Sequence, residues 1–162
     1  MTPFWDDARV TDRVQVRRLR AEDRDAWDAL WRGYLRFYRA DVSAAVTEAT
    51  FARLRDERDR MLGLVAVDQS DRPIGLAHLV FHPSTWSETS YCYLEDMFVS
   101  PAARGGRIAH ALFDAVYAAA GERGAERVYW HTQQYNGAAR SLYDTVGNLT
   151  SFIVYEHDLS PS

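Results

Sequence analysis

The spacing of apolar residues along the first third of the chain predicts one strand followed by two helices. Val14, Val16 and the region of Leu19 carry the apolar positions of a first strand. Aromatic residues and leucines then recur three and four positions apart behind an acidic first turn, which predicts a helix over residues 22–39. A second, shorter helix is expected over residues 47–57.

The middle of the chain is dominated by longer apolar runs. The runs 62–67 and 74–81 are separated by the turn-forming residues 68–73, and together they predict an antiparallel hairpin. A third long strand is expected over residues 91–99. A broad apolar stripe at helical spacing follows and ends at Gly121, so one side of this helix should be buried.

The last third repeats this alternation on a smaller scale. A short strand is expected over residues 128–132, and a helix over 139–146 with Asn136 as its N-cap and Gly147 at its end. Residues 152–159 are predicted to close the chain as a strand. The order of elements indicates an α/β fold with a mixed, largely antiparallel central sheet and helices on both faces.

Length and composition limit the class of protein. The chain has 162 residues, 47% of them hydrophobic and 26% charged, which is the balance of one soluble globular domain spanning residues 1–162. No apolar run approaches the ~20 residues that cross a bilayer, and the first residues lack the basic and apolar regions of an export signal. We therefore expect a cytoplasmic protein with no membrane partner.

Charge and cysteine content narrow the possible partners. The chain has no lysine, so its 19 basic residues are all arginine, and the net charge is −4. The arginines alternate with carboxylates and form no basic stripe, which argues against nucleic acid and favours a cationic partner. The lone Cys92 excludes an internal disulfide and a multi-thiolate metal site. The five histidines lack metal-ligand spacing, so no metal is expected.

The segment from Val99 to Leu112 joins a strand to an amphipathic helix through a glycine-containing turn. Such a turn presents unpaired backbone N–H groups and the positive end of a helix dipole to an anion. The dinucleotide fingerprint does not fit, because the two glycines are adjacent, and the P-loop pattern needs a lysine. The alternative is an ordinary helix start after a tight turn.

The same turn resembles the acetyl-CoA pyrophosphate loop of the GNAT superfamily of N-acetyltransferases, Gln/Arg-x-x-Gly-x-Gly/Ala. The matching residues are Arg104, Gly105, Gly106, Arg107, Ile108 and Ala109. One position departs from the pattern: Arg107 stands where the family usually has its central glycine, so its side chain must point away from the cofactor. The resemblance implies a GNAT-like fold and acetyl-CoA as co-substrate.

Residues 136–147 resemble a second motif of this family, Asn-x-x-Ala-x-x-Leu/Phe-Tyr-x-x-x-Gly. The resemblance implies that Asn136 and Ala139 line the pantetheine channel. It also implies that the Tyr143 hydroxyl lies near the cofactor sulfur, where a proton donor helps the thiolate to leave. The alternative is a half-buried core tyrosine.

Residues 93–99 resemble the Leu-Glu-Asp segment of spermidine/spermine acetyltransferases and their relatives. A primary ammonium must lose a proton before it can attack, and Glu95 is the candidate base. Asp96 points to the opposite face if the strand is regular, so the bulge usual in the family decides which acid faces the site. The alternative is that both carboxylates are solvated or ion-paired.

The family also polarises the thioester carbonyl with a backbone N–H of this strand, here that of Met97 or Phe98, and Val99 completes the cofactor-binding residues of the strand. Cys92 alternates away from Glu95 and lacks Cys-His-Asp spacing. We therefore expect a small buried residue at Cys92 and no acetyl-cysteine intermediate.

Residues 31–38, 82–86 and 128–132 resemble the bacterial branch related to histone/polyamine-type acetyltransferases, in which these segments surround the acceptor pocket. An aromatic wall there would attract an ammonium group; the alternative is that these rings belong to the core. The substrate-binding residues that the resemblance implies are Tyr34, Tyr38, Trp86, Glu95, Asp96 and His131. The short C-terminal tail leaves the last sheet edge incomplete, so a homodimer is expected.

The resemblance implies direct transfer of acetyl from acetyl-CoA to the primary amine of a small molecule such as a polyamine, a diamine or an amino acid, with Glu95 as base and Tyr143 as acid. One alternative is acetylation of a protein lysine or N-terminus, although the bulky Trp31, Tyr34 and Trp86 indicate an enclosed pocket. The other is a non-catalytic acyl-CoA sensor, which would tolerate the loss of Glu95 and Tyr143.

Overall fold

The computed structural model describes residues 14–105 and 107–159 of the chain. The chain divides into two compact units, one ending at His131 and the other beginning at Thr132. Within the described residues, no helix is both long enough and apolar enough to cross a membrane.

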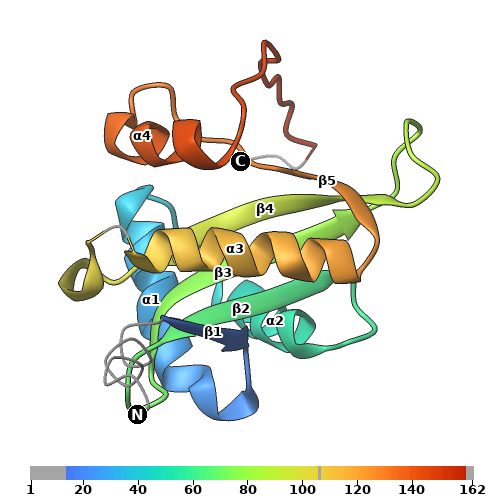
Figure 1. Ribbon diagram of the computed structural model, residues 1–162. Helices are drawn as coiled ribbons and strands as arrows, with labels where there is room; N and C mark the ends of the chain where they lie inside the picture. The colour runs from blue at the N-terminus through green and yellow to red at the C-terminus, as the bar shows by residue number, and fades with distance from the viewer. Residues whose placement is uncertain (1–13, 106, 160–162) are drawn as a thin grey trace, which may run out of the picture. The chain divides into compact units, whose positions relative to one another are not determined.

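A five-stranded sheet forms the centre of the first unit (Figure 1). Its strands lie side by side in sequence order: β1 (Gln15–Arg18), β2 (Met61–Val67), β3 (Pro73–His82), β4 (Ser90–Val99) and β5 (Ala125–Tyr129). Neighbouring strands are antiparallel except β4 and β5, which are parallel. The sheet is therefore mixed and largely antiparallel, and this part of the sequence prediction is confirmed.

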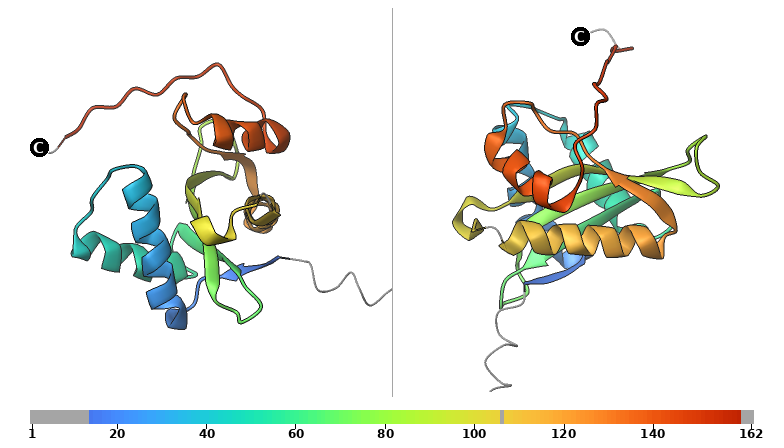
Figure 2. Two further views of the ribbon diagram at one scale, coloured as in Figure 1. Left: turned by 90° about the vertical axis from the view of Figure 1, so that its left-hand side faces the viewer. Right: turned by 45° about the horizontal axis from the view of Figure 1, so that its top comes forward.

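Helices cover both faces of the sheet (Figure 2). A short 3-10 turn (η1, Ala21–Asp23) leads into α1 (Arg24–Phe37), which shares one face with α2 (Ala44–Arg55), while α3 (Arg107–Glu122) covers the other. The α2 helix begins at Ala44, earlier than the predicted residue 47. The reason is its cap, because Ser43 Oγ accepts a hydrogen bond from the Val46 N–H at 3.2 Å.

The core lies on both sides of the sheet. On the α1 and α2 side, Trp27 and Leu54 are completely buried and belong to one cluster with Leu76 and Phe98 of the sheet. On the other side, α3 contributes completely buried apolar residues: Leu112, Phe113 and Val116. Each such side chain contributes roughly 1.5–3 kcal/mol by leaving water, so both helical layers are firmly attached to the strands that carry the candidate site.

Gly33 lets α1 approach β4 closely. A Cβ atom at Gly33 would lie 2.7 Å from Phe98 Cε1, well inside van der Waals contact. We expect Gly33→Ala to lower the free energy of unfolding by about 1–3 kcal/mol, as overpacking does in other cores. The measurement is urea denaturation. Gly121→Ala is the matched control, since a Cβ there meets nothing within 4 Å and a helical alanine should stabilise by up to about 1 kcal/mol.

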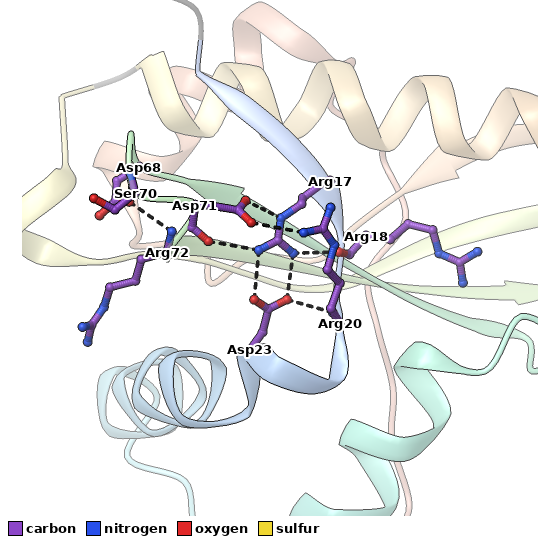
Figure 3. A network of polar contacts seen from close by, with 8 residues as sticks. All are labelled: Arg17, Arg18, Arg20, Asp23, Asp68, Ser70, Asp71 and Arg72. Atoms are coloured by element: carbon purple, nitrogen blue, oxygen red, sulfur yellow. Dashed lines mark hydrogen bonds and ion pairs between the residues drawn. The ribbon is translucent and has the colours of Figure 1, made fainter.

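A network of ion pairs anchors the start of α1 to the sheet (Figure 3). Arg17 of β1 donates two hydrogen bonds to Asp23, at 2.8 and 2.9 Å, and a third from Nε to Asp71 in the β2–β3 turn at 2.7 Å. The Asp23 side chain is only 4% exposed and that of Arg17 9%. These contacts tie three segments together that are distant in sequence.

The second unit contains one helix, α4 (Gly137–Val146), among the residues described. As predicted, Asn136 caps it, with Oδ1 accepting from the Ala139 N–H at 3.5 Å, and the helix ends before Gly147. The prediction of a strand over residues 152–159 is wrong, because the structure assigns no strand there. The segment is rich in β-forming residues, but a strand exists only where another strand pairs with it.

Candidate functional site

A β-bulge in β4 places the two candidate acids. Asp96 pairs with His78 of β3, and Leu94 pairs with the next residue, Leu79, so Glu95 is the extra residue between the two pairs. The strand is therefore not regular at this point. The alternation rule that would put Glu95 and Asp96 on opposite faces does not apply.

Asp96 lies at the centre of a partly buried hydrogen-bond network. Its Oδ2 atom is 2.9 Å from His78 Nδ1, and Tyr34 lies near enough that burial, together with the Asp96 carboxylate, raises the pKa of the Tyr34 hydroxyl. The other ring nitrogen of His78, Nε2, is 3.0 Å from Trp27 Nε1. The Asp96 side chain is 13% exposed and that of His78 1%, so Asp96 connects the solvent-facing site to the core.

Glu95 has the electrostatic character of a poised base. It is solvent-accessible, yet protein atoms partly desolvate its carboxyl group, and this desolvation together with the Asp96 charge raises its pKa. Desolvation and the charges of Glu95 and Asp96 likewise raise the pKa of Tyr93. A carboxyl with a raised pKa accepts a proton more readily near neutral pH than an ordinary glutamate does.

Aromatic rings from α1 adjoin this acidic pair. Trp31 stacks on Tyr34 with ring centroids 5.5 Å apart, and Tyr34 contacts Tyr38 at 4.9 Å. Burial and Asp96 raise the pKa of the Tyr34 hydroxyl, so at least this ring lies next to the acidic pair as well as against the core. The structure brings Tyr34 and Tyr38 together, whereas their predicted contact with substrate stays a prediction.

Further rings lie on the strands next to Glu95. Tyr93 stacks on Tyr129 at 5.0 Å, and its hydroxyl is 3.2 Å from His131 Nδ1, so His131 lies beside these rings. The predicted contact of His131 with substrate stays a prediction. Trp86, the remaining aromatic candidate, lies in the loop between β3 and β4 and is 80% exposed. It does not share the packing of the other rings.

The far half of β4 presents backbone donors on its open side. The last pair between β4 and β5 is Tyr93 with Tyr129, whereas β4 continues beyond it. At the end of β4 the Ser100 N–H donates to the Ile74 carbonyl of β3 at 2.9 Å. Because N–H groups alternate along a strand, the Met97 N–H points away from β3, toward the side where pairing with β5 has ended.

The turn before α3 suits an anion. Arg104 is held by a hydrogen bond from its Nε to the Val99 carbonyl at 3.3 Å, and its guanidinium lies over the Phe98 ring at 5.7 Å. A Cβ atom at Gly105 would meet nothing within 4 Å. Arg107 is the first residue of the 16-residue helix α3, followed by Ile108 and Ala109, so the N-terminus of a long helix opens directly after the turn. Gly106 lies outside the described residues.

The open space at Gly105 provides a fit test for the cofactor. Neither a positive φ nor a packing contact calls for glycine at this position. A glycine that the fold itself does not need fits a turn that a phosphate group approaches closely. The open space at Gly105 is thus compatible with the predicted pyrophosphate contact, which stays a prediction.

The remaining predicted site residues lie in the second unit. Asn136 and Ala139 meet at the N-terminus of α4, and Tyr143 lies two turns along the same helix. Their predicted contacts with the cofactor stay predictions. Cys92 is completely buried, and burial raises the pKa of its thiol to about 12, so it is not a nucleophile. In the described ranges 14–105 and 107–159, no three His, Cys, Asp or Glu side chains gather in a way that could hold a metal ion.

The sequence analysis missed the roles of His78 and Trp27. His78 counted only as one of five histidines without metal-ligand spacing. The available signal was its position in the middle of an otherwise apolar strand, Pro73–His82. A polar side chain at such a position needs a buried hydrogen-bond partner.

Comparison with known proteins gives the family. The family model of the acetyltransferase (GNAT) family matches residues 26–147. The chain is 33% identical over 150 residues to the D-amino-acid N-acetyltransferase HPA3 of Saccharomyces cerevisiae, covering 92% of this chain and 93% of that protein. It is 30% identical over 110 residues to the thialysine N-epsilon-acetyltransferase of Caenorhabditis elegans, covering 67% of this chain and 68% of that protein.

Solved structures agree on the fold. The aminoglycoside N-acetyltransferase AAC(6')-Iy, crystallised in complex with CoA, superposes with a TM-score of 0.69 at 17% identity, covering 91% of this chain and 100% of that one. At this identity the likeness shows the fold alone. Taken with the match of the family model over most of the chain, it confirms the predicted GNAT-like fold and acetyltransferase class: this chain belongs to the acetyltransferase (GNAT) family.

Proposed function

We propose that this protein transfers acetyl from acetyl-CoA to the primary amine of a small molecule, such as a polyamine, a diamine or an amino acid. The observation that carries the proposal is the pair Glu95 and Asp96, set at a β-bulge among the rings of Tyr34 and Tyr93. Adjacent carboxylates among aromatic rings suit an ammonium group by charge and by cation–π attraction.

Acetyl-CoA would be held by two parts of the first unit. The turn from Arg104 to Ala109 would bind the pyrophosphate with backbone N–H groups, and the side chain of Arg107 would lie at its edge. The Met97 N–H, favoured over that of Phe98 by its direction, would face the thioester carbonyl. Bound acetyl-CoA supplies an activated acetyl thioester. From the second unit, Asn136 and Ala139 would line the pantetheine channel.

The chain's own residues then divide the acid–base work. Asp96 with the rings of Tyr34 and Tyr38 holds the acceptor as its ammonium ion. Glu95, with its raised pKa, removes the proton that blocks the nitrogen lone pair. Tyr143 donates its phenolic proton toward the departing sulfur, and the direct attack needs no covalent enzyme intermediate.

The relatives support a small amine acceptor. One is named a D-amino-acid N-acetyltransferase and another a thialysine N-epsilon-acetyltransferase. Each name describes acetylation of a small molecule. A protein acceptor needs an open groove, whereas the rings of Trp31, Tyr34 and Tyr38 contact one another in sequence, with Tyr34 close to Asp96.

A panel assay tests this function. Acetyl-CoA consumption is measured with polyamines, amino acids of both configurations, aminoglycosides and lysine peptides. Turnover of at least one small amine with kcat/KM far above that of the peptides is the expected result. Turnover of peptides alone would assign the protein lysine or N-terminal alternative. Binding of acetyl-CoA without turnover of any acceptor would favour the sensor.

Gly105→Val is expected to weaken acetyl-CoA binding at least about tenfold, since losing even one hydrogen bond to a charged group costs about 1.5–3 kcal/mol. The new side chain fits the protein, because a Cβ at Gly105 meets nothing within 4 Å. Calorimetry measures the affinity, and circular dichroism checks the fold. Arg107→Gly is the control, because it restores the family pattern and should bind as well as the wild type. If Gly105→Val binds acetyl-CoA with unchanged affinity, the assignment of the pyrophosphate site to this turn is wrong.

We further propose that the two units act as one acetyltransferase domain, since the family model spans residues from both.

A homodimer is proposed because β5 lies at the edge of the sheet and the tail carries exposed apolar side chains, among them Phe152 at 84% and Tyr155 at 89%. Light scattering should give a mass of two chains, and truncation after residue 148 should give the mass of one chain.

The single, buried and unpaired Cys92 suits a cytoplasmic location.

A further inference from the structure

Trp27, His78 and Asp96 form a hydrogen-bonded chain from the core beneath α1 to the carboxylate pair. Trp27 Nε1 is 3.0 Å from His78 Nε2, and His78 Nδ1 is 2.9 Å from Asp96 Oδ2. Trp27 is completely buried and His78 is 1% exposed. A histidine at this depth cannot meet a substrate, so any contribution to function acts through Asp96.

The indole decides which proton the imidazole carries. An indole N–H can only donate, so His78 Nε2 must accept and therefore has no proton. The proton of the neutral ring then lies on Nδ1, which donates to Asp96. An imidazolium would set two N–H donors against each other across 3.0 Å. Trp27 thus selects the neutral form of His78 with its proton on Nδ1.

The neutral form of His78 matters for the charge of Asp96. A neutral donor orients a carboxylate but leaves its charge in place, whereas an imidazolium would form an ion pair and cancel it. The neighbouring Tyr34 hydroxyl is also neutral, because burial and the Asp96 charge raise the pKa of Tyr34. Asp96 is therefore oriented by the neutral Nδ1–H donor of His78, with the neutral Tyr34 hydroxyl nearby.

We propose that Trp27 and His78 are positioning residues that hold Asp96 as an oriented, uncompensated anion, and that Asp96 binds the ammonium group of the acceptor. This rests on the proposed function, in which the acceptor is an amine. Other ionisable groups that act on this hydrogen-bonded network are Glu95 and Tyr93 on β4, Tyr38 directly after α1, and Arg53 on α2. Arg53 is paired with Asp59 at 3.0 Å. In this division of roles, Asp96 binds the ammonium group and Glu95 accepts the proton from it.

Two substitutions at His78 separate positioning from packing. His78→Phe removes the donor to Asp96 and should raise the KM for the amine about tenfold or more, as the loss of a hydrogen bond to a charged group does. His78→Asn places a neutral amide N–H near the position of Nδ1 and should restore much of that loss. The KM for acetyl-CoA should change little in either variant. Equal KM values for the amine in both variants would overturn the proposal.

Trp27→Phe tests the selection of the neutral form. Without the indole N–H, no donor opposes a proton on His78 Nε2, so acidification can convert His78 to the imidazolium. The KM for the amine should then rise tenfold or more from pH 8 to pH 6, relative to the wild type. Phe51→Leu is the matched control, since Phe51 packs on the Trp27 ring at 4.9 Å but leaves its N–H in place. The same pH dependence in Trp27→Phe and in the wild type would contradict the inference.

Nuclear magnetic resonance gives a readout that needs no turnover. Long-range ¹H–¹⁵N spectra of the wild type at pH 6 should show His78 neutral, with its proton on Nδ1. This result supports the positioning roles even if no amine in the panel is acetylated, in which case only the proposed function fails. An imidazolium at His78 in the wild type overturns the positioning roles even if an amine is acetylated.

Discussion

Glu95→Gln is expected to lower kcat/KM for the amine about 10²–10⁴-fold at neutral pH, the usual cost of one positioned proton-transfer group. The amide has nearly the shape of the carboxyl but cannot accept the ammonium proton. The missing base can be replaced by raising the pH until the free amine is abundant. The rise of the pH–rate profile should therefore move up toward the pKa of the amine itself, and acetyl-CoA affinity should stay unchanged.

In the wild type, the rise of the reaction rate with increasing pH follows the ionisation of Glu95. Desolvation and the neighbouring Asp96 raise the pKa of Glu95, so activity should be lost on acidification at a higher pH than an ordinary glutamate would give. Tyr143→Phe provides the contrast, because it removes an acid: it should lower kcat without shifting the rise. An unshifted profile and a small loss of rate in Glu95→Gln would transfer the base role to Asp96, His131 or bulk water.

The elements with strong local signals were predictable from the sequence. The hairpin β2–β3 and the strand β4 follow from long apolar runs separated by turn residues, and α1 from aromatic residues at helical spacing. The predicted strand 152–159 fails because strand formation depends on a pairing partner, which the sequence of the segment does not contain.

The candidate site could be predicted only as a set of residue types. Glu95 and Asp96 stand out as acids in an apolar strand, but their arrangement depends on the register with β3, which skips one residue at Glu95. The bonds from Trp27 to His78 and from His78 to Asp96 join residues 51 and 18 positions apart. No periodicity within one segment reports contacts of this kind, because they arise when α1 packs on the assembled sheet.

Asp23→Asn is expected to lower the free energy of unfolding by about 3–5 kcal/mol at neutral pH, the usual cost of removing one partner from a buried ion pair. Arg17 and Asp23 are both almost completely buried, and Asp23 also accepts from the Arg20 N–H at 2.8 Å. Asparagine keeps the shape but leaves the Arg17 guanidinium without its buried counter-charge. Urea denaturation gives the difference. Asp71→Asn is the matched control, because Asp71 also binds Arg17 but is 53% exposed, so its loss should cost less than about 1 kcal/mol.

The pH dependence of this difference has a definite sign. Burial tends to raise the pKa of Asp23, but the hydrogen bonds from Arg17 and from the Arg20 backbone outweigh it and lower the pKa below its ordinary value. A carboxyl with a lowered pKa in the folded state adds stability above its unfolded pKa, about 3.9. That stability disappears as the pH falls through the folded pKa. The gap between wild type and Asp23→Asn should therefore be constant above about pH 5 and shrink below about pH 4. A gap that is independent of pH, or no larger than that of Asp71→Asn, would mean that packing rather than the buried charge pair anchors α1 and the Tyr34 that it carries.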